Sequence, residues 1–203
     1  MHYKDKAGPN SLEYADRLAI PFPVQINGQQ QMKKALSDPR ETRFSGGRSF
    51  TTYRFDTPDQ YTLPQATGAA TVETRLSYDD PSAVNSMRFM LNSGIWKVLS
   101  LSLFDSVRRS MLYNPGDGNS HEVVIETVGT DGVGIRKRTK SSIIDPLGQT
   151  HMTAAGAAIQ VERALGLRDA IVAPSGLSFP EQAQGLPQLL GSLREMGVTI
   201  VGE

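Results

Sequence analysis

The residues best suited to bind a charged ligand are three arginines around a glycine loop. Arg43 and Arg48 flank the segment Arg-Phe-Ser-Gly-Gly-Arg, and Arg54 follows on the next predicted strand. Guanidinium groups and the backbone N–H groups of a glycine turn are good ligands for a carboxylate or phosphate. One interpretation is an anion site formed by the loop and its flanking arginines; if the substrate is amino-acid-like, Arg43, Arg48 and Arg54 are the candidates to bind its carboxylates. The other is a hairpin turn with solvated flanks, which we favour for a lone Gly-Gly pair.

No motif assigns catalytic residues. The chain has no cysteine and three scattered histidines, His2, His121 and His151, so we predict no zinc site and no thiolate chemistry. It has no G-x-S-x-G segment that would support a hydrolytic triad. We interpret His121, which begins a predicted strand, and His151, which precedes a predicted helix, as structural or solvated residues.

The composition excludes several classes of function. The chain has 203 residues, enough for one large or two small domains, with 21 Lys+Arg against 21 Asp+Glu. A formal net charge of zero argues against nucleic acid or an anionic membrane as a partner. No apolar run approaches the roughly 20 residues that a membrane span needs, and the N-terminus has no apolar signal core. Because the absence of cysteine suits a reducing compartment, we expect a cytoplasmic protein.

A hairpin centred on Asp131-Gly132 is the strongest structural pattern. Residues 121–130 and 133–144 are rich in strand formers, and a two-residue loop would require positive φ at both Asp131 and Gly132. Such a loop fixes the register and predicts the following facing pairs: Thr130 with Val133, Val128 with Ile135, and Glu126 with Lys137.

Three cations, Arg136, Arg138 and Lys140, fall on one face of the second strand of this hairpin. They could line a groove for acidic groups. We favour the alternative of a solvated face whose aliphatic stems cover Val123 and Ile125.

The remaining elements predict an α+β fold. Asp80 and Pro81 open a helix that Gly94 bends or ends, and a second helix covers 101–113. A helix capped by Thr150 or Thr153 runs to Leu165, with Gly166 after its end. The other predicted segments are a short helix at 29–36, extended chain at 61–64, strands at 24–26, 48–55 and 71–78, and a Leu-rich helix stopped by Gly197 before a strand at 198–201. We expect a mixed, largely antiparallel sheet with helices on one face, and a second copy of the chain on the other face.

From Glu122 onward, the order of features resembles the C-terminal domain of the saccharopine dehydrogenase-like family. A strand reaches Gly129, a Thr-Ala-Ala-Gly-Ala-Ala helix follows at Thr153–Ala158, and Gly176, Pro180 and Glu181 form a Gly-x-x-x-Pro-Glu element. Upstream, Arg54-Phe55-Asp56 and the segment 71–75 look like the central sheet of the same family. The resemblance covers roughly residues 20–203, with residues 1–19 as a polar N-terminal segment.

The resemblance implies the second domain of a two-domain dehydrogenase. Family members begin with a Rossmann domain, whose G-x-G-x-x-G fingerprint holds the dinucleotide, and this chain has no such fingerprint. We therefore expect no cofactor in this chain, with NAD(P) bound by the Rossmann domain of the parent enzyme. In the family the second domain contacts an amino-acid-like or other small substrate and forms the homodimer. We expect the isolated chain to be inactive and to show no NAD(P)H binding by fluorescence titration.

Three functions remain open. The chain could be the substrate-binding and dimerisation domain of an NAD(P)-dependent oxidoreductase. It could be a non-catalytic relative that binds a small molecule, or a purely structural homodimer module.

Overall fold

The helices and strands of this protein form two compact units. The computed structural model describes residues 9–78, 80–112, 120–168, 176, 179–182 and 185–202. Unit 1 contains Met1–Thr42 and Ser49–Gly118, and unit 2 contains Arg43–Arg48 and Asn119–Glu203. The predicted α+β class is confirmed, but the strands form three small antiparallel sheets in place of one mixed sheet. None of the described helices is long and apolar enough to cross a membrane.

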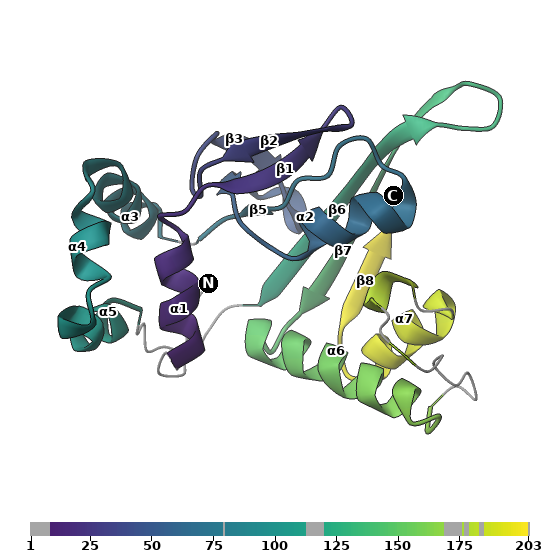
Figure 1. Ribbon diagram of the computed structural model, residues 1–203. Coiled ribbons are helices and arrows are strands. Elements are labelled where there is room, and N and C mark those ends of the chain that lie inside the picture. Colours follow the sequence, from purple (N-terminus) through teal and green to yellow (C-terminus); the bar gives the residue numbers. More distant parts are fainter. Residues whose placement is uncertain are drawn as a thin grey trace. The chain divides into compact units, whose positions relative to one another are not determined.

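Unit 1 combines a two-stranded sheet, a three-stranded sheet and short helices (Figure 1). The strands pair in the orders β1-β2 and β3-β4-β5. The elements are α1 (Pro9–Arg17), β1 (Phe22–Ile26), β2 (Gln29–Lys33), β3 (Arg40–Arg43), β4 (Ser49–Arg54), α2 (Asp59–Thr67), β5 (Arg75–Leu76), α3 (Pro81–Ser93), α4 (Ile95–Leu99) and α5 (Asp105–Leu112), with a 3-10 turn at Ser102–Phe104 before α5.

The β1–β2 hairpin has the tightest turn in unit 1. Ile26 pairs with Gln29, so only Asn27 and Gly28 form the loop, with φ of 51° and 78°. Positive φ at both positions is what a type I′ turn requires, and Asn-Gly is its preferred sequence. The predicted helix at 29–36 is therefore wrong, because the turn directs Gln29–Lys33 back along β1 as a strand.

The core of unit 1 consists of two apolar clusters and a buried tryptophan. One cluster contains Phe22, Val24 and Ala35, and the other contains Leu36, Tyr53 and Val84. Trp96 is fully buried, and its indole N–H donates to the carbonyl of Ala15 at 3.1 Å. The residues before position 20 thus contribute α1 to this core, with Leu12 and Ala15 buried.

Capping residues set the helix ends of unit 1. The Asp80 carboxylate accepts a hydrogen bond from the Ser82 backbone at 2.8 Å, as predicted for an N-cap. Gly94, at φ 79°, ends α3, and the chain restarts as α4. The extended chain predicted at 61–64 is instead part of α2, which ends at Gly68 with φ 70°.

Unit 2 is a three-stranded antiparallel sheet with two helices packed beside it (Figure 1). The strand order is β6-β7-β8. The buried apolar residues include Ala155 and Ile159 on α6 and Val198 before β8. The elements are β6 (His121–Thr130), β7 (Arg136–Asp145), α6 (Gln149–Ala164), α7 (Leu186–Glu195) and β8 (Thr199–Gly202), with 3-10 turns at Ser45–Gly47 and Pro180–Gln182.

Glycines set the helix ends of unit 2. The N-cap of α6 is Gly148, not Thr150 or Thr153. Gly166 and Gly197 follow the ends of α6 and α7 with positive φ, as predicted. Part of the Gly176–Glu181 element, and His2, lie outside the described residues.

The predicted register of the β6–β7 hairpin is wrong. Thr130 pairs with Arg136, and the Asp131 N–H donates to the Ile135 carbonyl at 2.9 Å. Gly134, and not Gly132, has positive φ, at 83°. The loop is therefore a three-residue turn with a glycine in the left-handed region, a common alternative to the two-residue turn.

This change of register moves the cationic stripe to the opposite face from the one predicted. Pairing is shifted by three residues, an odd number, and an odd shift reverses which side chains share a face. Lys140 now faces Glu126, and Arg138 contacts the Glu126 carboxylate at 2.9 Å. Val123 and Ile125 lie on the other face, so the stems of Arg136, Arg138 and Lys140 do not cover them.

Candidate functional site

The three predicted substrate-binding arginines belong to different units. Arg54 ends β4 in unit 1, whereas Arg43 and Arg48 flank the glycine loop in unit 2. Their arrangement around one substrate stays a prediction. The contacts of Arg54 are therefore described within unit 1, and those of Arg43 and Arg48 within unit 2.

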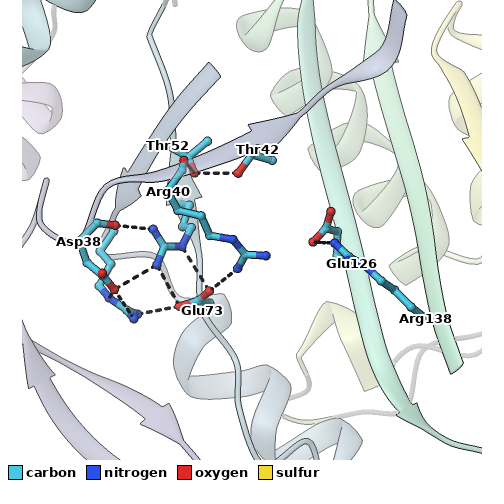
Figure 2. Close-up of polar contacts among 9 residues, drawn as sticks. Asp38, Arg40, Thr42, Thr52, Glu73, Glu126 and Arg138 are labelled. Atoms are coloured by element: carbon cyan, nitrogen blue, oxygen red, sulfur yellow. Dashed lines mark hydrogen bonds and ion pairs between the residues drawn. The ribbon is translucent and has the colours of Figure 1, made fainter. Parts of the chain in front are cut away.

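Arg54 lies at the centre of a dense ion-pair cluster. It is 6% exposed, and its Nη2 and Nη1 lie 2.7 Å from Asp38 Oδ2 and 2.9 Å from Glu73 Oε2. Arg75 contacts the same two carboxylates, at 3.1 Å and 3.2 Å. Arg40 reaches Glu73 at 3.0 Å from the adjoining strand (Figure 2). Arg54 is therefore surrounded by carboxylates of its own chain.

The arginines of this cluster keep both carboxyl groups ionised. The hydrogen bond from Arg54 lowers the pKa of Asp38 below its ordinary value. Burial by itself would raise the pKa of Glu73, but the hydrogen bond from Arg75 and the charges of Arg75, Arg54 and Arg40 lower it. A substrate carboxylate would have to displace Asp38 or Glu73 to reach Arg54, which makes Arg54 a poorer ligand for substrate than the sequence predicts.

The glycine loop of unit 2 binds a carboxylate supplied by the chain itself. The Ser45 backbone N–H and its hydroxyl each donate to the Glu122 carboxylate at 2.8 Å. Arg48 Nη2 lies 3.7 Å from the same carboxylate, whose side chain is 6% exposed. Gly46 and Gly47 both have positive φ, which only glycine adopts freely. The loop thus binds an anion of its own unit, and its role in binding a substrate stays a prediction.

The side chains of Arg43 and Arg48 lie at the surface of the same loop. Both residues are exposed, and the Arg43 carbonyl accepts a hydrogen bond from Lys140 Nζ at 2.8 Å. Lys140 therefore brings a third cation of unit 2 to this loop.

A buried carboxylate and two histidines meet where β7 turns into α6. Asp145 has no exposed surface, and its Oδ2 lies 2.7 Å from His151 Nδ1. Its Oδ1 accepts a hydrogen bond from the Leu147 backbone at 2.8 Å. His121 pairs across the strands with Asp145, and burial lowers the pKa of its imidazole. Sequence reasoning treated the two histidines separately and missed Asp145, because the register that joins it to His121 was wrong.

Asp56 lies at the centre of another polar cluster, in unit 1. Its carboxylate binds Arg17 at 2.8 Å and the Tyr61 hydroxyl at 3.2 Å, and its carbonyl accepts from the Tyr14 hydroxyl. Burial, and then the charge of Asp56, raise the pKa of both tyrosines. This cluster ties α1 to the start of α2.

The described part of the chain has a small cavity and no cluster of metal ligands. They contain no group of three or more His, Cys, Asp or Glu side chains arranged to hold a metal ion. A cavity of about 80 Å³ in unit 1 has the volume of only a few water molecules, at roughly 30 Å³ each. It is lined by Pro23, Gln25, Gln30, Gln60, Tyr61, Pro64 and Gln65.

Compared with known proteins, the chain matches no family model and no curated protein sequence. The resemblance to the saccharopine dehydrogenase-like family therefore stays a prediction.

Proposed function

We propose that this chain is the substrate-binding and dimerisation domain of a cytoplasmic NAD(P)-dependent oxidoreductase of the saccharopine dehydrogenase-like type. The nucleotide would be held by a separate Rossmann domain, which performs the hydride chemistry with its cofactor. The observation that supports the proposal is the pair of exposed cations, Arg43 and Arg48, at the two ends of a glycine loop whose inner donors bind the Glu122 carboxylate of the same unit. Amino-acid-like substrates present the same carboxylate group.

The exposed cations beside this loop would bind the substrate. Arg43 and Arg48 lie at its two ends and are exposed. A second carboxylate arriving there would receive charge-assisted hydrogen bonds, which are worth about 1.5–3 kcal/mol each. Arg54 would act as a structural residue of unit 1, because Asp38 and Glu73 already neutralise it.

Calorimetric titration of the chain with a dicarboxylic amino acid such as glutamate tests this role. Replacing Arg48 with alanine should weaken binding about 10- to 100-fold, the equivalent of one or two charge-assisted bonds. Arg136→Ala is the matched control, since it removes the same charge from the exposed hairpin of the same unit. Equal affinity for the wild type and the Arg43→Ala/Arg48→Ala double variant would remove the substrate-binding role.

Dimerisation would use the apolar face of β6. Val123 and Ile125 are exposed on the same face of the sheet. Apolar sheet faces of this kind pair with a second copy in many homodimers.

Sedimentation equilibrium of the wild type and Ile125→Lys tests the dimer. The variant should be monomeric at concentrations where the wild type is dimeric, because a desolvated lysine opposes association at the centre of an interface. Val161→Lys, at a more exposed apolar residue on α6, is the control and should leave the dimer intact. A monomeric wild type, or a dimer unaffected by Ile125→Lys, would exclude this face.

A further inference from the structure

The junction of β7 and α6 contains a group that the proposed function leaves unused. Asp145, the last residue of β7, is completely buried, while the side chain of His151 in the first turn of α6 is 34% exposed. The two are joined by a 2.7 Å contact between Asp145 Oδ2 and His151 Nδ1. A buried carboxylate paired with a solvent-accessible imidazole has the arrangement of a positioned acid–base group.

The hydrogen bonds of Asp145 determine the tautomer of His151. When Asp145 is ionised, its carboxylate only accepts hydrogen bonds, and the proton between the two residues then belongs to Nδ1 of the imidazole. The second carboxylate oxygen is occupied by the Leu147 N–H, which fixes the orientation of Asp145. Nε2 of neutral His151 is then left with its lone pair, ready to accept a proton.

The backbone at this junction is built to bring the two residues together. Gly148 has φ 95° and ψ −176°, a region that is almost restricted to glycine. This conformation turns the chain from β7 into α6 within the few residues that separate Asp145 from His151. Because Gly148 has no side chain, it does not cap the N-terminus of α6. The positive end of the α6 dipole lies beside His151, which is in the first turn of the helix.

We propose that His151 is a general base that removes a proton from a hydroxyl- or amine-bearing substrate, with Asp145 as its positioning residue. The Nε2 lone pair takes the proton from the substrate oxygen or nitrogen, and Asp145 stabilises the imidazolium that results. The positive end of α6 opposes a cation on His151, so the charge that stabilises the imidazolium comes from Asp145. His151 later releases the proton to solvent through its exposed side.

This inference rests on the proposed function, since oxidation at a C–O or C–N centre releases one proton and one hydride. A nicotinamide bound by the separate domain would accept the hydride with its electron pair. The proton bound to the substrate oxygen or nitrogen goes to His151, and a C=O or C=N bond forms. The tautomer and the reactivity of the His151 imidazole are properties of this chain, so they can be measured without the cofactor.

Histidine ¹⁵N NMR and carbethoxylation by diethyl pyrocarbonate, mapped by mass spectrometry, test the site. The wild type should show His151 as the Nδ1–H tautomer and carry the modification on Nε2. In Asp145→Asn, Oδ1 keeps the Leu147 N–H and the new amide group donates to His151 Nδ1, which forces the Nε2–H tautomer. Carbethoxylation of His151 should then slow at least about 10-fold, since Nε2 has lost its lone pair.

The matched control is Asp131→Asn, which removes a carboxylate charge from the hairpin turn of the same unit and should leave both signals of His151 unchanged. Near-equal circular dichroism spectra of the two variants exclude unfolding as the cause. An Nε2–H tautomer in the wild type, or equal reactivity of His151 in wild type and Asp145→Asn, would overturn the proposal. Glutamate titration and sedimentation test the proposed function separately, so its failure is distinguishable from a failure of the His151 site.

Discussion

Replacing Arg54 with methionine should destabilise unit 1 strongly, because it removes the cation that Asp38 and Glu73 share. Breaking a buried ion pair by removing one partner costs about 3–5 kcal/mol. Asp38 is half-exposed and Arg75 still contacts both carboxylates, which reduces the cost to about 2–4 kcal/mol. The aliphatic part of the arginine stem is retained in methionine, so lost packing adds little.

Trp96 provides the assay. It is the only tryptophan of the chain and is fully buried in unit 1, so its fluorescence in a urea titration reports the unfolding of that unit. The control is Arg40→Met, which removes an exposed cation from the same cluster and should cost about 0–1 kcal/mol.

The effect of Arg54→Met should depend on pH. The pKa values of Asp38 and Glu73 are both lowered in the folded protein, from ordinary values of 3.8 and 4.5. A lowered pKa contributes stability above the ordinary value, and this contribution is lost as the pH falls through the folded value. The difference between wild type and variant should therefore be full at pH 7 and shrink below about pH 4.5. A cost no larger than that of Arg40→Met, or one independent of pH, would refute the structural role of Arg54.

Three further predictions concern the other clusters. Burial raises the pKa of Tyr14 and Tyr61 above the ordinary value of 10.0. The stability that these two phenols contribute is therefore present below pH 10 and is lost as the pH rises above it. In an absorbance titration, Tyr61→Phe should show one fewer phenol ionising above pH 10 than the wild type. Gly148→Ala should lower the free energy of unfolding of unit 2 by about 1–3 kcal/mol in chemical denaturation, because its backbone conformation strains any residue with a Cβ. Asp131→Ala should loosen the β6–β7 turn and speed hydrogen exchange at the Ile135 amide, which donates to the Asp131 side chain.

Elements bounded by strong local signals were predictable from the sequence. Asp80 followed by Pro81 predicted the start of α3, and Gly94 marked the place where the helix would bend or end; the structure shows that it ends there. Gly166 and Gly197 likewise marked the ends of α6 and α7. Each of these signals acts within about one helical turn, through a side-chain cap or the positive φ of a glycine, so it depends little on distant residues.

The two turn sequences Asn27-Gly28 and Asp131-Gly132 show where a local rule becomes ambiguous. The first pair forms the two-residue turn that the rule predicts. At the second, the Asp131 carboxylate accepts hydrogen bonds from the N–H groups of Val133 and Ile135. Gly134 then takes the left-handed conformation that Gly132 would otherwise need. A second glycine two residues beyond the first offered the longer turn, and the aspartate hydrogen bonds stabilise it.

The candidate site could not be predicted completely, because its cations are matched by carboxylates far away in the sequence. The glycine loop was recognisable as an anion-binding element, but its anion, Glu122, lies 77 residues beyond Ser45. Arg54 was recognisable as a possible ligand, but Glu73 reaches it only through the pairing of β4 with β5. In a chain with equal numbers of acidic and basic residues, a cluster of arginines is as well suited to an internal partner as to a substrate. Residue types therefore indicate the chemistry of a site, whereas the register of the strands decides whether that chemistry is already used within the fold.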